Sequence, residues 1–263
     1  MVRYYGSWLE DDQLYIKTEL CGGGSLSTLF ETGIVFTESQ LCEALRQVAS
    51  GLALIHARNF VHLDIKPENI YVYESDKRVY KIGDFGLLSN ADTKRDIEEG
   101  DCRYLPKELL DTEEDHILTK ADIFSLGCSI YELALHKALP KRGEEWFQLR
   151  EGILNLPPPF SAEFEDLLKI MMHPDPSVRP SAIDLLTHPL LATEEEKKMM
   201  KQKAEMIALQ KMNEEMKFRL VVAENEIDRI KNSGKEHRET MERIKNLEVL
   251  LATFLQNVNG NRP

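Results

Sequence analysis

The chain has 263 residues, of which 42% are hydrophobic, enough for one large domain or a smaller one with an appendage. Its 33 basic residues are outnumbered by 45 acidic ones, so the formal charge is −12. This balance disfavours broad nucleic-acid binding, which needs many Lys and Arg to neutralise phosphates, and we expect no nucleic-acid partner. Since no apolar run is long enough to cross a bilayer, we expect a soluble protein with no membrane span.

The first predicted elements are two strands. Residues 14–19 alternate between apolar and polar, and residues 2–5 precede the acidic turn of residues 10–12. Two strands alone are marginally stable in water, so we expect that the strands that would pair with them are missing from the chain as given, which leaves an apolar face exposed.

A helix is predicted to follow. Thr37 and Gln40 form a capping box that opens it. One apolar stripe then recurs at helical spacing, at Leu41, Leu45, Val48, Leu52 and Ile55. Further on, residues 61–73 are predicted to be a loop followed by a strand, residues 79–82 a second short strand, and residues 122–135 a helix that is buried nearly all round.

The composition changes near Thr193, after which charges and methionines dominate. Apolar residues fall there on heptad a and d positions, with Asn213 as a polar a position. Gly234 interrupts this stretch, and a second amphipathic stretch follows. Three interpretations stay open: a coiled coil that mediates self-association, a helix folded back on the preceding domain, or a charged helix with little stable partner.

The four cysteines, Cys21, Cys42, Cys102 and Cys128, are isolated in the sequence. This spacing favours a reduced intracellular compartment over a disulfide framework or a zinc site.

Two short motifs carry the chemistry. The first is His62-Leu63-Asp64-Ile65-Lys66-Pro67-Glu68-Asn69, and the second is Asp84-Phe85-Gly86 after a strand–turn–strand. Asp64 is predicted to be a catalytic base and Lys66 a catalytic cation near a transferring phosphate. Asn69 and Asp84 offer the oxygen ligands that Mg²⁺ prefers. Each motif alone is weak, but the two together are highly specific.

The joint pattern resembles the catalytic loop and metal-binding triplet of eukaryotic protein kinases. Residues 1 to about 191 resemble the later part of that domain, starting at its fourth strand. The resemblance implies an α+β, mostly α fold: a kinase C-terminal lobe with a remnant of the small-lobe sheet and a C-terminal amphipathic helical tail. The implied domains are residues 1–20 (strands and hinge), 21–191 (C-lobe) and 192–263 (charged helical tail with a break near 233–236).

The same resemblance implies ATP and Mg²⁺ as cofactors. Glu19 to Cys21 resembles the hinge whose backbone binds adenine, so Glu19, Cys21, Asn69 and Asp84 are the implied cofactor-binding residues. Asp122 matches the buried aspartate that holds the catalytic-loop backbone.

Within the kinases, Glu98-Glu99-Gly100-Asp101-Cys102-Arg103-Tyr104 resembles the activation segment of the Wee family. These are inhibitory kinases that phosphorylate a tyrosine of cyclin-dependent kinases. The resemblance implies transfer of the ATP γ-phosphate to such a tyrosine, a cyclin-dependent kinase as partner, negative regulation of mitotic entry, and the nucleus, with the cytoplasm as the alternative. The charged tail is similar to the soluble nuclear branch and Leu63 to the membrane-tethered Myt branch; both branches stay open.

Three departures from the kinase pattern matter. Leu63 replaces the arginine that normally pairs with a phosphorylated activation segment, so we expect a segment that does not depend on phosphate at Ser89 or Thr93. Lys66 is the residue of serine/threonine kinases, so tyrosine specificity rests on the Wee resemblance alone. The glycine loop, its lysine and the helix glutamate are not in the sequence, and Lys17 lies on the wrong strand to replace them.

We therefore expect little or no kinase activity from the chain as given. The alternatives are a non-catalytic half-kinase that acts as an interaction module through its C-lobe and tail, and a poorly folded fragment without function.

Overall fold

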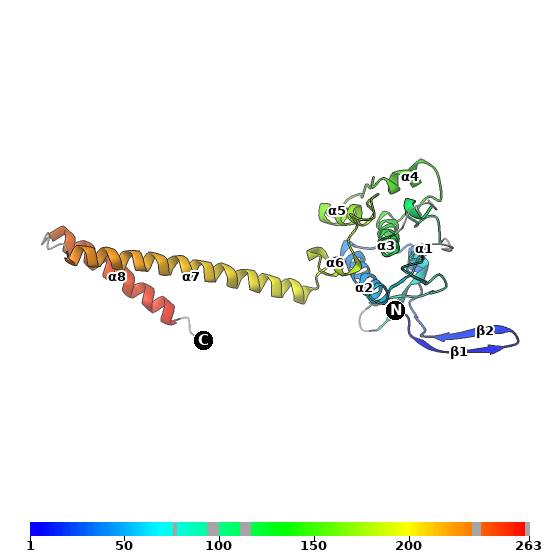
Figure 1. Cartoon of the computed structure of the whole chain (residues 1–263), viewed down its shortest axis with the longest axis horizontal. Helices are drawn as coiled ribbons and strands as arrows, with labels where there is room; N and C mark the ends of the chain where they lie inside the picture. The colour runs from blue at the N-terminus through cyan, green and yellow to red at the C-terminus, as the bar shows by residue number, and fades with distance from the viewer. Residues whose placement is uncertain (76–77, 94–99, 111–116, 233–237, 261–263) are drawn as a thin grey trace. The chain divides into compact units, whose positions relative to one another are not determined.

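The structure, a computed structural model, describes residues 1–75, 78–93, 100–110, 117–232 and 238–260 (Figure 1). The chain divides into two compact units, Met1–Ala192 and Thr193–Pro263.

The first unit holds short strands and most of the helices. In chain order its elements are β1 (Tyr4–Glu10), β2 (Gln13–Thr18), α1 (Leu26–Glu31), α2 (Glu38–His56), β3 (Phe60–Val61), η1 (Pro67–Asn69), β4 (Ile70–Glu74), β5 (Arg78–Ile82), β6 (Ser89–Asn90), η2 (Lys107–Leu110), α3 (Leu118–Leu135), α4 (Glu144–Arg150), α5 (Ala162–Met171), α6 (Ala182–Leu186) and η3 (Pro189–Leu191). Here η denotes a 3-10 helix. The strands form three antiparallel pairs, β1–β2, β3–β6 and β4–β5.

Helices α2 and α3 form the centre of this unit. The capping box of Thr37 and Gln40 opens α2 as predicted, and its apolar stripe is buried. Helix α3 is buried along nearly its whole length, and Figure 1 shows it among the surrounding helices. Both predicted helices are confirmed, and the strand predicted at the end of residues 61–73 and the one at 79–82 are observed as β4 and β5.

The β1–β2 hairpin contrasts with that core. Figure 1 shows it extending away from the helices of the first unit. Large apolar side chains on it are exposed, among them Leu9 at 70%, Leu14 at 65% and Ile16 at 60%. At its base the Val2 amide donates to the Ile82 carbonyl at 2.7 Å. Among the described residues, β1 and β2 form ladders with each other alone.

The second unit is helical. It consists of α7 (Glu194–Asn232) and α8 (Arg238–Gly260), and the predicted interruption at Gly234 lies outside the described residues. Ile227 on α7 and Ile244 on α8 are 7% and 8% exposed, because the two helices pack against each other there. Other apolar residues on the predicted heptad a and d positions, such as Met206 and Leu209, are more than half exposed. Self-association through these heptad positions stays a prediction.

The predicted fold class is confirmed: the first unit is a mostly helical lobe with a small strand pair before it. Within the described part of the chain, no helix combines the length and apolar character needed to cross a bilayer.

Candidate active site

The loop from His62 to Asn69 is fixed by a buried carboxylate. Asp122, on α3, has no exposed surface. It accepts hydrogen bonds from the backbone amides of His62 at 2.9 Å and Leu63 at 2.8 Å. His56 Nε2 lies 2.8 Å from the same carboxylate. The backbone of Leu63 has a φ of 63°, an unusual conformation for a side chain of this kind, and the Asp122 contacts hold it.

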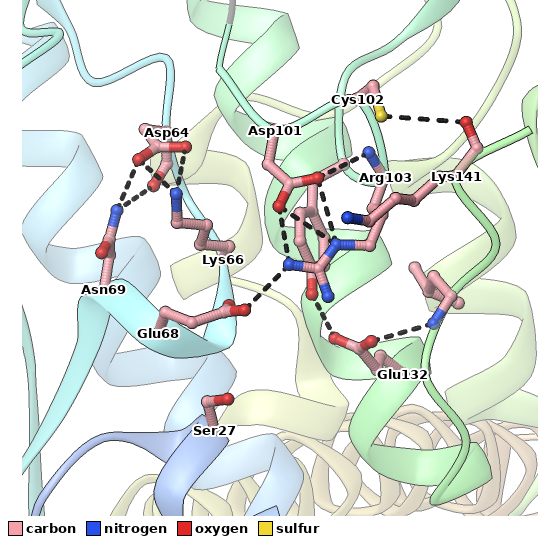
Figure 2. A network of polar contacts seen from close by, with 12 residues as sticks. Ser27, Asp64, Lys66, Glu68, Asn69, Asp101, Cys102, Arg103, Glu132 and Lys141 are labelled. Carbon is pink, nitrogen blue, oxygen red and sulfur yellow. Dashed lines mark hydrogen bonds and ion pairs between the residues drawn. The ribbon is translucent and has the colours of Figure 1, made fainter.

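Three of the predicted site residues contact one another in this loop. Lys66 Nζ lies 2.9 and 2.7 Å from the two carboxylate oxygens of Asp64. Asn69 Nδ2 donates to the Asp64 carbonyl and to its Oδ2, both at 2.8 Å (Figure 2). The amide oxygen of Asn69 is its remaining acceptor. The loop therefore presents a carboxylate, an ammonium and an amide oxygen together.

Asp84 is joined to this group through its preceding residue. The Gly83 amide donates to the Asn69 carbonyl at 3.0 Å. Asp84 therefore directly follows a residue whose backbone is hydrogen-bonded to Asn69. The ring of His62 lies 3.2 Å from the Gly83 carbonyl and 5.4 Å from the Phe85 ring, centroid to centroid. Burial lowers the pKa of the His62 imidazole, which favours its uncharged form. Asp84 itself is exposed, with a left-handed φ of 55°.

The remaining predicted residues line a neighbouring cavity of about 660 Å³. Its walls come from the hairpin base, the hinge and the start of the metal-binding triplet, and they include Val2, Ile16, Thr18, Glu19, Cys21 and Asp84. The Glu19 carboxylate is bound by Lys81 Nζ at 2.6 Å and by the Arg3 amide at 3.1 Å, which lower its pKa. Burial raises the pKa of the Cys21 thiol. Lys17 is exposed on β2.

The segment after the triplet carries polar contacts that the sequence motifs did not predict. Arg103 donates to Asp101 and to Glu68 of the catalytic loop, and Figure 2 shows it between them. Burial would raise the pKa of Asp101, but the hydrogen bonds from Arg103 outweigh it and lower that pKa. Glu98 and Glu99, which belong to the same predicted motif, lie outside the described residues. Nothing in the spacing of the motif indicates that Arg103 reaches the catalytic loop.

Tyr104 anchors the same segment to the core. Its hydroxyl donates to Glu132, a residue of α3 that is 4% exposed. Glu132 also accepts the Leu139 amide at 2.9 Å. Burial raises the pKa of Glu132 although both donors oppose the shift.

Glu108 and Arg179 form a buried ion pair in this lobe. Arg179 Nη1 and Nη2 lie 2.5 and 3.0 Å from the carboxylate oxygens of Glu108. The side chains are 1% and 11% exposed. Arg179 also donates to the His173 carbonyl at 2.7 Å, so its charge is well satisfied.

The donor set fits a magnesium ion held together with phosphate oxygens. Mg²⁺ keeps waters and is usually bound by one or two protein oxygens plus substrate phosphates. Asn69 and Asp84 supply one amide and one carboxylate oxygen donor from adjoining backbone positions. Among the described residues no group of three or more His, Cys, Asp or Glu is arranged as an all-protein metal site.

The known proteins that are similar to this chain in sequence or structure are protein kinases. The protein kinase domain family matches residues 1–191. The chain is 40% identical over 213 residues to Wee1-like protein kinase 1-B of Xenopus laevis, covering 73% of this chain and 36% of the relative. It is 36% identical over 258 residues to the Wee1-like protein kinase of Drosophila melanogaster, covering 86% and 42%. It is 39% identical over 251 residues to Wee1-like protein kinase 2 of Danio rerio, covering 86% and 46%.

A solved structure shares the fold. The Rad53 kinase domain, in a crystal structure with SCD2 and AMPPNP, superposes with a TM-score of 0.61 at 24% identity and covers 73% of this chain and 74% of that one. The chain therefore belongs to the protein kinase family, and within it to the Wee-type kinases. It spans less than half the length of the curated relatives described above.

Proposed function

We propose that this protein acts in the transfer of the ATP γ-phosphate to a protein hydroxyl. The observation that carries the proposal is the contact of Asp64 with Lys66 and Asn69 in a loop that Asp122 fixes from the core. Phosphoryl transfer depends on positioning and charge neutralisation more than on covalent chemistry, and a fixed loop supplies both.

Each residue has a proposed role. The Asp64 carboxylate receives and orients the substrate hydroxyl and accepts its proton. Lys66, whose ammonium lies 2.7 Å from Asp64, holds that carboxylate and offers positive charge to the phosphate. Asn69 and Asp84 would hold Mg²⁺, and bound Mg²⁺–ATP supplies the phosphoryl group. The backbones of Glu19 and Cys21, which line the 660 Å³ cavity, would bind the adenine.

For the substrate we propose a regulatory tyrosine of a cyclin-dependent kinase, with negative control of mitotic entry in the nucleus as the setting. The similarity to Wee1-like kinases supports this assignment. Lys66 does not support it, because this is the residue that serine/threonine kinases carry at that position.

A radiolabel transfer assay tests the catalytic proposal. The 263-residue chain is incubated with Mg²⁺, labelled ATP and a tyrosine peptide. Asp64→Asn should lower transfer by roughly 100- to 10,000-fold, the usual contribution of a general base. The matched control is Asp92→Asn, on an exposed carboxylate after β6. Transfer that Asp64→Asn leaves unchanged would contradict the role of Asp64. The sequence-based expectation of little transfer by this chain stays a prediction of the same assay.

Nucleotide binding separates the two candidate functions. The alternative is a non-catalytic interaction module, favoured by the exposed apolar residues of α7 and the β1–β2 hairpin. A ligand present at 100 times its Kd adds about 2.7 kcal/mol of stability. Mg²⁺–ATP should therefore raise the melting temperature of the chain. Asp84→Asn should remove the part of this rise that depends on Mg²⁺. No shift with Mg²⁺–ATP favours the interaction module.

A further inference from the structure

One arginine bridges the catalytic loop and the segment that follows the metal-binding triplet. Arg103 Nη2 lies 2.9 Å from Glu68 Oε1 and 2.6 Å from Asp101 Oδ2. Its Nε lies 3.1 and 3.0 Å from the two Asp101 oxygens. Figure 2 shows Glu68 between Asn69 and Arg103, so the bridge joins the loop that carries Asp64 to residues 101–103.

The two segments are in direct backbone contact. A Cβ on Gly100 would lie 2.5 Å from the Leu63 carbonyl oxygen and 3.1 Å from Asp64 Oδ1. Because the first distance is too short for any side chain, the position requires glycine. Residues 100–103 thus border the place where a substrate hydroxyl would reach Asp64.

The other side of the segment is held by a second arginine. Arg150, at the end of α4, is 1% exposed. It donates to the carbonyls of Cys102 at 2.9 Å, Arg103 at 3.2 Å and Leu105 at 2.6 Å. Trp146 Nε1 donates to the Cys102 carbonyl at 2.9 Å. The α4 side fixes the backbone of the segment, which leaves Arg103 to set its contact with the catalytic loop.

We propose that Arg103 is a positioning residue that fixes residues 100–105 against the catalytic loop through Glu68 and Asp101, and thereby shapes the site for the protein substrate. The inference rests on the proposed function. Leu63 leaves the catalytic loop without the arginine that a phosphate would bind, and the Arg103 bridge makes the equivalent connection with carboxylates of the chain itself.

The geometry separates this bridge from an ordinary surface pair. Exposed ion pairs contribute little, because solvent screens them and holding two long side chains costs entropy. Here Arg103 and Asp101 are 19% and 20% exposed, and the guanidinium engages both oxygens of Asp101. This pair orients the guanidinium, whose Nη2 makes the one contact to Glu68, a side chain that is 37% exposed. Fork-like contacts of this kind are the stronger and more directional ones.

A double-mutant cycle tests the bridge independently of catalysis. Glu68→Gln, Arg103→Gln and the double variant are compared by denaturant unfolding. We expect a coupling of about threefold to tenfold in the unfolding equilibrium constant, as for a partly buried charge-assisted contact. The control cycle uses Lys137 and Glu145, which are 63% and 64% exposed, and should show about twofold or less. Additive effects at Glu68 and Arg103 would overturn the proposal.

Hydrogen exchange and kinetics then separate positioning from local stability. In Arg103→Gln, the amides of Tyr104 and Asp64 should exchange about tenfold faster while the β4–β5 ladder stays unchanged, and Arg103→Lys should restore part of the protection. Unchanged exchange at Asp64 would overturn the proposal even if the cycle shows coupling.

Where transfer is measured, Arg103→Gln should raise KM for the tyrosine peptide about tenfold and leave KM for ATP within twofold. Equal changes in both KM values would also overturn it. If the chain binds no nucleotide, the proposed function is contradicted. The double-mutant cycle and the hydrogen exchange of the Asp64 amide need no nucleotide, so they still decide the role of Arg103.

Discussion

Two parts of the first unit, the catalytic loop and the β1–β2 hairpin, are built in opposite ways. The catalytic loop is tied to α3 by Asp122 and lies over a buried core. The hairpin, whose base lines the cavity beside Asp84, exposes large apolar side chains such as Leu14 and Ile16. The loop is pre-organised by tertiary contacts of the chain itself, whereas the hairpin depends on the pairing of two strands. Substitutions in the two parts should therefore have very different costs.

The largest effect is expected where the lobe holds a buried charge. Glu108→Gln leaves Arg179, which is 1% exposed, without its anionic partner. Removing one member of a buried ion pair costs about 3–5 kcal/mol, because the remaining charge stays desolvated. Denaturant unfolding monitored by tryptophan fluorescence measures the change. The matched control is Glu151→Gln, since the Lys107–Glu151 pair is more than half exposed on both side chains and should cost well under 1 kcal/mol. Similar costs at the two glutamates would show that the lobe is not anchored by the buried pair.

A smaller but more local effect is expected at the attachment of the catalytic loop. Asp122→Asn removes the charge that receives the His62 and Leu63 amides and turns one acceptor into a donor. Hydrogen bonds to a charged group contribute about 1.5–3 kcal/mol, so we expect a loss of about 2–3 kcal/mol. Hydrogen exchange should show faster exchange at His62 and Leu63 than in β5. Unchanged protection of those two amides would mean that Asp122 does not pre-organise the catalytic loop.

The third effect changes with pH. Burial raises the pKa of Glu132 in the folded chain above its ordinary value near 4.5. A carboxyl group of this kind favours folding below its unfolded pKa and loses that contribution as the pH rises through its folded pKa. Relative to Glu132→Gln, the wild-type chain should therefore become less stable as the pH rises from 4.5, until Glu132 is ionised in the folded state. Urea unfolding from pH 4 upward measures this difference. A pH-independent gap between the two proteins would contradict the assigned direction.

The same contrast explains what the sequence could predict. Asp64, Lys66 and Asn69 lie close together in the sequence of one loop, so their spacing alone predicts that their side chains lie near one another. Their link to Asp84 was predictable because both motifs flank one strand pair. The Arg103–Glu68 bridge was not, because it depends on the path of residues 84–103 through space rather than on a local period. The exposure of the hairpin was predictable only from the expectation that the strand pair lacks neighbours, since an alternating strand has the same pattern whether or not another element covers its apolar face.

The smallest effect is expected on the hairpin itself. Ile16→Ala removes a side chain that is 60% exposed, and surface substitutions of this kind usually change stability by less than about 0.5 kcal/mol. The matched variant Ile82→Ala removes the same atoms from a residue of β5 that is 1% exposed, where the loss should be about 2–5 kcal/mol. Both are measured by urea unfolding of the 263-residue chain. If Ile16→Ala costs as much as Ile82→Ala, the apolar face of the hairpin is covered in solution, and the contrast between the hairpin and the anchored lobe disappears.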